Sequence, residues 1–145
     1  MNTCILRNKA FILIFFVFDS ASVQAQEIKK LKDHNYWTVK NLSLDIGDSY
    51  CYNDSIQYCG KYGRLYTWSA AIKVCEHLGQ GWHLPTSNEW INLLNHYGRA
   101  FQDSVNNGKK SFSRLLKQGK HRFNAMLGGN RNLDESYSRL EAHGF

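Results

Sequence analysis

The residues best suited to chemistry in this chain are its four cysteines and six histidines. Three of the cysteines, Cys51, Cys59 and Cys75, lie in the body of the chain, and no pair has the C-x-x-C spacing of a zinc site. The histidines form no H-x-H or H-x-x-x-H pair beside a carboxylate, so we interpret them as surface or core residues. Cys75 and His77 lie two positions apart in a predicted helix and face different sides, which argues against a Cys–His nucleophile pair.

An acidic, turn-rich stretch offers the remaining candidate ligands. Asp45, Asp48 and Asp54 could hold calcium together with backbone carbonyls, but their spacing differs from that of an EF-hand loop. We therefore expect solvated turn residues there. No G-x-S-x-G motif and no glycine-rich phosphate loop is present in the sequence. We expect no catalytic residue, no metal and no cofactor.

Residues 1–25 have the three parts of a secretory signal peptide. Arg7 and Lys9 supply the positive charge, residues 10–18 (AFILIFFVF) form the apolar part, and Val23 and Ala25 are the small residues before a cleavage site. The apolar part is too short to span a bilayer. We therefore expect cleavage after Ala25 and a secreted, periplasmic or surface-bound bacterial protein without a membrane span. The alternatives are an uncleaved anchor or a buried first helix.

Export affects the interpretation of the cysteines, because thiols in an oxidising compartment tend to pair. Cleavage would remove Cys4 and leave an odd number. Cys51 and Cys59 flank a turn-rich segment and are predicted to form a disulfide, although either could instead pair with Cys75. In the first case the Cys75 thiol is free, or its partner is missing from the chain.

The chain of 145 residues carries 18 Lys and Arg against 12 Asp and Glu, a net charge of +6. Residues 109–122 contain six basic residues and no acidic one. They are Lys109, Lys110, Arg114, Lys117, Lys120 and Arg122. Such a run can bind a polyanion, but a solvated face is its commoner meaning, and export argues against nucleic acid as a partner.

The length allows one domain, which mixes short extended segments with helices. Residues 26–35 are polar and are expected to form an exposed lead-in. Residues 36–40 and 62–66 are predicted to be extended, residues 41–60 to be a loop held by its two cysteines, and residues 123–127 to be a strand.

Two helices are predicted from caps and periodicity. Thr67 is the expected N-cap of a helix over residues 68–78 that ends at Gly79. The spacing predicts one apolar face made of Trp68, Ala71, Ile72, Cys75 and Leu78.

The second helix is expected to begin at a capping box of Thr86 and Glu89 and to end at Gly98. Its predicted apolar stripe consists of Trp90, Leu93, Leu94 and Tyr97.

Several segments together resemble the Fibrobacter succinogenes major paralogous domain, over nearly all of residues 36–145. They are the W-x-x-x-N-L stretch from Trp37, Y-G-R-L-Y-T-W from Tyr62, G-W-H-L-P-T-S-N-E-W from Gly81 and F-x-A-x-x-G-G-x-R ending at Arg131. The motif residues, expected to be structural, are Trp37, Asn41, Tyr62, Gly63, Arg64, Tyr66, Trp68, Gly81, Trp82, His83, Leu84, Pro85, Thr86, Glu89, Trp90, Gly128, Gly129 and Arg131.

The resemblance implies an α+β, C-type lectin-like fold with two helices packed on a small antiparallel sheet. It also implies that the closing C-terminal strands are missing and that Cys75 would bond to a cysteine in the last of them. We accordingly expect residues 36–145 to be a partial domain.

The expected function is an exported, non-catalytic binding module at the cell surface or outside the cell, with carbohydrate or protein as ligand. The alternatives are an enzyme related to the formylglycine-generating group, whose members share an L-P-T-x-x-E-W segment, and a structural surface component.

Overall fold

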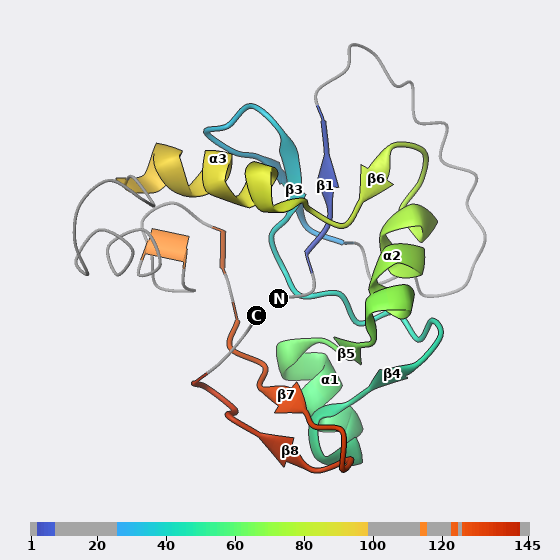
Figure 1. The fold of residues 1–145 in the computed structure, drawn as a ribbon. Helices are drawn as coiled ribbons and strands as arrows, with labels where there is room; N and C mark the ends of the chain where they lie inside the picture. Colours follow the sequence, from blue (N-terminus) through green and yellow to red (C-terminus); the bar gives the residue numbers. More distant parts are fainter. Residues whose placement is uncertain (1–2, 8–25, 99–113, 116–122, 125, 143–145) are drawn as a thin grey trace.

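The computed structural model describes residues 3–7, 26–98, 114–115, 123–124 and 126–142 (Figure 1), and the fold is α+β. In chain order the elements are β1 (Ile5–Leu6), β2 (Ile28–Lys30), β3 (Tyr36–Thr38), β4 (Ser49–Tyr50), a 3-10 helix (Tyr52–Asp54), α1 (Ile56–Tyr62), β5 (Leu65–Tyr66), α2 (Trp68–His77), β6 (Trp82–His83), α3 (Ser87–Gly98), β7 (Asn130–Arg131) and β8 (Tyr137–Ser138).

The largest sheet has the strand order β2-β3-β1-β6, with every neighbour antiparallel. Ile5 pairs with Trp37 on one face, and both pack into a core with Leu93 and Tyr97 of α3. The opposite face, which includes Trp82, packs against α2. Two helices therefore cover the two faces of a short sheet, which lies above β4, β5, α1 and the β7–β8 hairpin in Figure 1.

Strand β1 belongs to the segment that was expected to be a leader. Cys4 and Ile5 have no exposed surface, and Cys4 forms a disulfide with Cys75. The prediction that Cys75 is unpaired or lacks its partner is therefore wrong for this chain, because the partner comes from the N-terminal end. Cleavage after Ala25 would remove β1, so the structure is that of the unprocessed chain.

The expected lead-in also contributes to the sheet. Residues 28–30 form the edge strand β2 against β3, and Leu31 and Asp33 beyond it are buried. The carboxylate of Asp33 accepts a hydrogen bond from the Trp37 indole at 2.9 Å. Along β2 the exposed residues Ile28 and Lys30 alternate with the partly buried Lys29, as expected for an edge strand that has one face in water.

Both predicted helices are confirmed. The Thr67 hydroxyl accepts a hydrogen bond from the backbone N–H of Ala70, and the Thr86–Glu89 capping box begins α3. In α3, Leu93 and Tyr97 are buried and the other two predicted stripe residues are partly buried.

The predicted apolar face of α2 is partly wrong. Its buried residues are Ala70, Val74 and Cys75, while Trp68 is 74% exposed and Ile72 37% exposed. The buried face therefore runs through Ala70, Val74 and Cys75, and Trp68 lies outside it.

The Cys51–Cys59 disulfide is confirmed, but the segment between its cysteines is more ordered than a loop. It contains the 3-10 helix and the start of α1, which ends at Tyr62. The Arg64 guanidinium lies 3.9 Å from both sulfur atoms and donates to Ser49. A helix of only seven residues, without a side-chain cap hydrogen bond, leaves little signal in the sequence.

Asn41 contacts the motif residues Tyr62 and Gly63, which lie some twenty positions further along the chain. The Asn41 amide donates to the carbonyls of Tyr62 and Met126, at 2.7 and 3.2 Å. Gly63 has φ +78°, and a Cβ there would lie 2.6 Å from the Cβ of Asn41. A tight approach of two backbone segments thus requires glycine.

The strand predicted over residues 123–127 does not form in the described part of that range. Residues 123–124 and 126–127 are irregular, and the neighbouring strand β7 begins at Asn130. Phe123 instead buries its ring against Trp37 and Trp90, at centroid distances of 6.0 and 5.9 Å. The apolar residues of 123–127 suggested a strand, but the burial of the Phe123 ring, and not strand pairing, accounts for this pattern.

Candidate functional site

The candidate site is an open pocket of about 820 Å³ between the β4–β5 pair and the β7–β8 hairpin. This volume lies within the usual range for small-molecule sites. Its lining residues are Tyr50, Leu65, Tyr66, Thr67, Gly129, Asn130, Arg131, Asn132, Leu133, Asp134 and Glu135. One wall therefore comes from the strands before α2, and the other from a single polar turn.

Arg131 forms the charged part of the pocket. Its guanidinium lies 3.9 Å from the centroid of the Tyr50 ring and 5.9 Å from that of Tyr137. It pairs with the exposed carboxylate of Glu135 at 3.3 Å, while its buried Nε has no hydrogen-bond partner among the described residues. Stacking on two rings fixes the guanidinium and leaves hydrogen-bonding capacity unused.

The polar wall is built by short-range hydrogen bonds. The Asn130 side-chain amide donates to the side-chain oxygen Oδ1 of Asn132 at 2.6 Å, and the Asn132 side-chain amide donates to the Ser136 hydroxyl at 2.9 Å. The Ser136 hydroxyl donates to Asp134, and this bond lowers the pKa of the Asp134 carboxyl. The wall thus presents amide and carboxylate groups whose orientation is fixed before any ligand arrives.

A hydrogen bond and burial fix the position of the Tyr66 side chain. Its hydroxyl donates to the Leu44 carbonyl at 2.6 Å, and burial raises the pKa of the phenol. Tyr66 therefore stays neutral and gives the pocket a fixed apolar surface.

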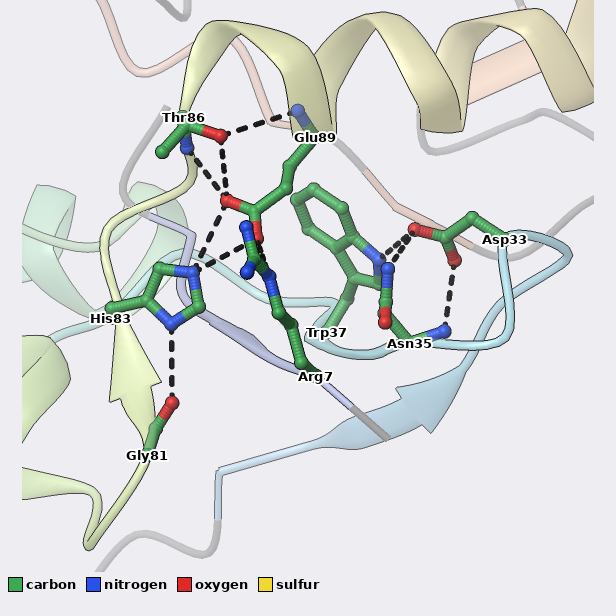
Figure 2. A network of polar contacts seen from close by, with 8 residues as sticks. All are labelled: Arg7, Asp33, Asn35, Trp37, Gly81, His83, Thr86 and Glu89. Carbon is green, nitrogen blue, oxygen red and sulfur yellow. Dashed lines mark hydrogen bonds and ion pairs between the residues drawn. The ribbon is translucent and has the colours of Figure 1, made fainter. Parts of the chain in front are cut away.

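A second polar cluster surrounds Glu89 (Figure 2). Its carboxylate accepts from the backbone and hydroxyl of Thr86, from Arg7 at 2.7 Å, and lies 3.0 Å from His83 Nε2. Burial alone would raise the Glu89 pKa, but these hydrogen bonds outweigh it and lower the pKa to about 2. A carboxylate held this way is a poor general acid or base near neutral pH. The cluster caps α3 and ties it to β1 and β6.

The acidic stretch does not converge on one point. Asp45 pairs with Arg64 at 2.8 Å, and Asp54 accepts a hydrogen bond from the Tyr137 hydroxyl at 2.6 Å. In the described part of the chain, no three His, Cys, Asp or Glu side chains form a possible metal site.

Only one basic side chain of the run over residues 109–122 is described. Arg114 donates to the Tyr97 carbonyl, at the end of α3, so it caps a helix. The lysines at 109, 110, 117 and 120 and the arginine at 122 lie outside the described residues, as do His121 and His143.

Most motif residues expected to be structural do lie in packing or capping positions. Trp37, Trp82 and the partly buried Trp90 and Leu84 belong to the two cores, and the short segment of Gly81, His83, Pro85 and Thr86 leads into α3. Gly128 packs on Tyr62. Three others, Tyr66, Gly129 and Arg131, line the pocket.

Sequence reasoning missed Tyr50, Asn132, Asp134 and Glu135 as site residues. The available signal was composition alone, since Asn and Asp are frequent in turns and Asn130, Asn132 and Asp134 lie close together in the sequence.

Residues 13–145 match the family model described as the Fibrobacter succinogenes major domain. The chain belongs to this family. The match to the Fibrobacter succinogenes major domain includes α1, α2, α3 and the whole pocket, but it begins after β1 and Cys4. No curated protein and no solved structure was found to match the chain.

Proposed function

We propose that this chain is an exported, non-catalytic binding module whose pocket takes a neutral carbohydrate. The observation that carries the proposal is the combination of aromatic surface from Tyr50 and Tyr66 with the fixed amides and carboxylates of residues 130–135. Sugars present apolar C–H faces and many hydroxyl groups, which such walls can contact and hydrogen-bond. Asp134 and Glu135 outweigh the charge of Arg131, which favours a neutral ligand over an acidic one.

The burial and bonding of three side chains that could be reactive, Cys75, His83 and Glu89, support a non-catalytic role. A relative of the formylglycine-generating enzymes would need a reactive thiolate at its site, whereas Cys75 is buried in the cluster beside α2 and does not line the pocket. Glu89 and His83 are bound to each other and to the start of α3. Neither lines the pocket.

Export is supported by the Cys51–Cys59 disulfide, which remains after cleavage at Ala25, because disulfides persist in oxidising compartments. Among the described residues, no helix has the length and apolar character needed to cross a bilayer. Together with the leader-like features of residues 1–25, this favours a secreted, periplasmic or surface location.

A protein ligand is the second candidate, because large apolar side chains are exposed. Trp68 and Ile56 are each 74% exposed, and Leu133 at the pocket is fully exposed. Exposed apolar side chains of this size are typical of interaction sites when they form one patch.

The test is an array of neutral and acidic glycans, followed by calorimetry with the best ligand. Asn132→Ala should weaken binding about tenfold, the effect of losing one or two hydrogen bonds. Asn92→Ala on the exposed side of α3 is the matched control and should bind normally. Mass spectrometry should recover the ligand unchanged. A protein that binds no glycan would refute the proposal and favour a structural surface component.

A further inference from the structure

Strand β1 lies between β3 and β6, in a position of the sheet that we call the slot. The residues of the family match do not supply this strand. The match begins at residue 13, whereas β1 consists of Ile5 and Leu6. The two flanking strands are both inside the match, and β1 hydrogen-bonds to both. A central position of the sheet is thus occupied by a segment from outside the family domain.

The slot specifies its occupant through backbone and side-chain contacts. Thr38 accepts a hydrogen bond from the Cys4 N–H with its hydroxyl at 2.9 Å and donates its own N–H to the Cys4 carbonyl at 3.0 Å. Ile5 lies between Trp37 and His83 in register and is fully buried. An occupant must therefore run antiparallel to both neighbours and be aliphatic at this position.

The two ends of the slot add a covalent and an ionic requirement. Cys75 of α2 bonds to the sulfur of Cys4 at one end. At the other end the Arg7 guanidinium lies against the Glu89 carboxylate, as Figure 2 shows. Glu89 has only 7% of its side chain exposed, so loss of the cation would leave a nearly buried carboxylate without its arginine partner.

We propose that in the exported chain, cleaved after Ala25, this slot binds an extended strand of another polypeptide. The strand has the pattern of a cysteine, two aliphatic residues and a cation, as residues 4–7 do. The inference rests on the processing step of the proposed function and is independent of the glycan pocket. Addition of a strand to open sheet edges is an established mode of peptide recognition, and it satisfies backbone groups that would otherwise lose their partners.

The cysteine count argues against a second copy as the occupant. In the cleaved chain Cys51 and Cys59 are bonded to each other and Cys75 belongs to the slot. None of these three cysteines is followed by two aliphatic residues. Within residues 26–145, no segment of a second copy therefore repeats the pattern of residues 4–7.

Covalent capture occurs by thiol–disulfide exchange with a partner whose cysteine carries a small thiol such as glutathione. The Cys75 thiolate attacks the partner's cysteine sulfur, a new disulfide joins the two proteins, and the small thiol leaves as a thiolate that takes up a proton from water. One disulfide is consumed and one is formed, so no further oxidant is needed.

The experiment uses the protein exported by cells that express the full chain. Its intact mass and oligomeric state are measured first. The probe is a peptide of residues 1–9 carrying glutathione on its cysteine. A peptide with Ile5→Asp and glutathione disulfide alone are the matched controls, because both can exchange but neither fits the slot.

We expect a monomer that begins at Gln26 and reacts with the probe at Cys75 at least tenfold faster than with either control. The adduct should also have a higher melting temperature. Equal rates for the two peptides would overturn the proposal, as would an exported chain that keeps residues 1–25 or a dimer whose slot is already filled. Glycan binding by the same preparation is scored separately, so failure of one proposal is distinguishable from failure of the other.

Discussion

Cys4 and Cys75 are joined by a disulfide although they lie 71 positions apart in the chain. The bond fastens the central strand of the main sheet to the helix that covers one of its faces. Both cysteines are almost completely buried, and Trp82 and Val74 pack in the same cluster. The first residues of the unprocessed chain are thus part of its core.

Replacing Cys4 by Ala should destabilise the unprocessed chain more than removing the local disulfide does. In the loop-entropy model, the Cys4–Cys75 bond contributes about 4 kcal/mol and the Cys51–Cys59 bond about 2.5 kcal/mol, because the first closes a much longer loop. Urea unfolding of Cys4→Ala and of the Cys51→Ala, Cys59→Ala double variant measures the difference.

Peptide mapping without reductant provides the control for this prediction. It should recover Cys4 linked to Cys75 and Cys51 linked to Cys59. A major species in which Cys75 is linked to Cys51 or Cys59 would contradict the structure.

Gly63→Ala should lower the free energy of unfolding by more than 2 kcal/mol, since φ +78° and overlap with Asn41 and the Leu42 carbonyl both oppose a side chain. Gly60→Ala is the matched control. Gly60 lies within α1 and a Cβ there meets no atom within 4 Å, so alanine should stabilise the helix by about 0.5–1 kcal/mol. Equal melting temperatures for the two variants would show that the approach of Gly63 to Asn41 is wrong.

Glu89 should make stability depend on acid pH. The folded pKa of about 2 lies below the ordinary 4.5, so the stabilisation is complete above about pH 4.5 and is lost as the pH falls toward 2. Glu89→Gln should cost roughly 1–3 kcal/mol at neutral pH and flatten the decline in that window.

The exposed Glu76 of α2 offers a comparison for this prediction. Glu76→Gln should leave both the stability and its pH profile close to those of the wild type. Chemical denaturation at several pH values decides between the two variants, and an unchanged acid profile for Glu89→Gln would rule out the proposed network.

Asp33→Ala should destabilise the chain by about 1–3 kcal/mol, because it leaves the buried indole N–H of Trp37 without its acceptor. Trp37 has no exposed surface, so water cannot replace the carboxylate without opening the core. Asp48→Ala, at an exposed turn position, should change stability by less than 0.5 kcal/mol. Thermal melts should show this difference; similar losses for both would contradict the buried bond.

The sequence alone determined α2 and α3 and the Cys51–Cys59 pair. Their signals are local: Thr67 and the Thr86–Glu89 box cap the helices, and two cysteines eight positions apart close a short loop. Short-range interactions of this kind depend little on the rest of the fold.

Tertiary structure decided which side of α2 is buried, where Cys75 finds its partner and where the pocket forms. Periodicity gives a helix an apolar face, but packing against the sheet buries Ala70, Val74 and Cys75 and leaves Trp68 exposed. Strand β1 is only two residues long, and its pairing is fixed by neighbours about 30 and 76 positions away, which no local pattern encodes. Tyr50 and Arg131 become neighbours for the same reason: only the packing of the β4–β5 pair beside the β7–β8 hairpin brings them together.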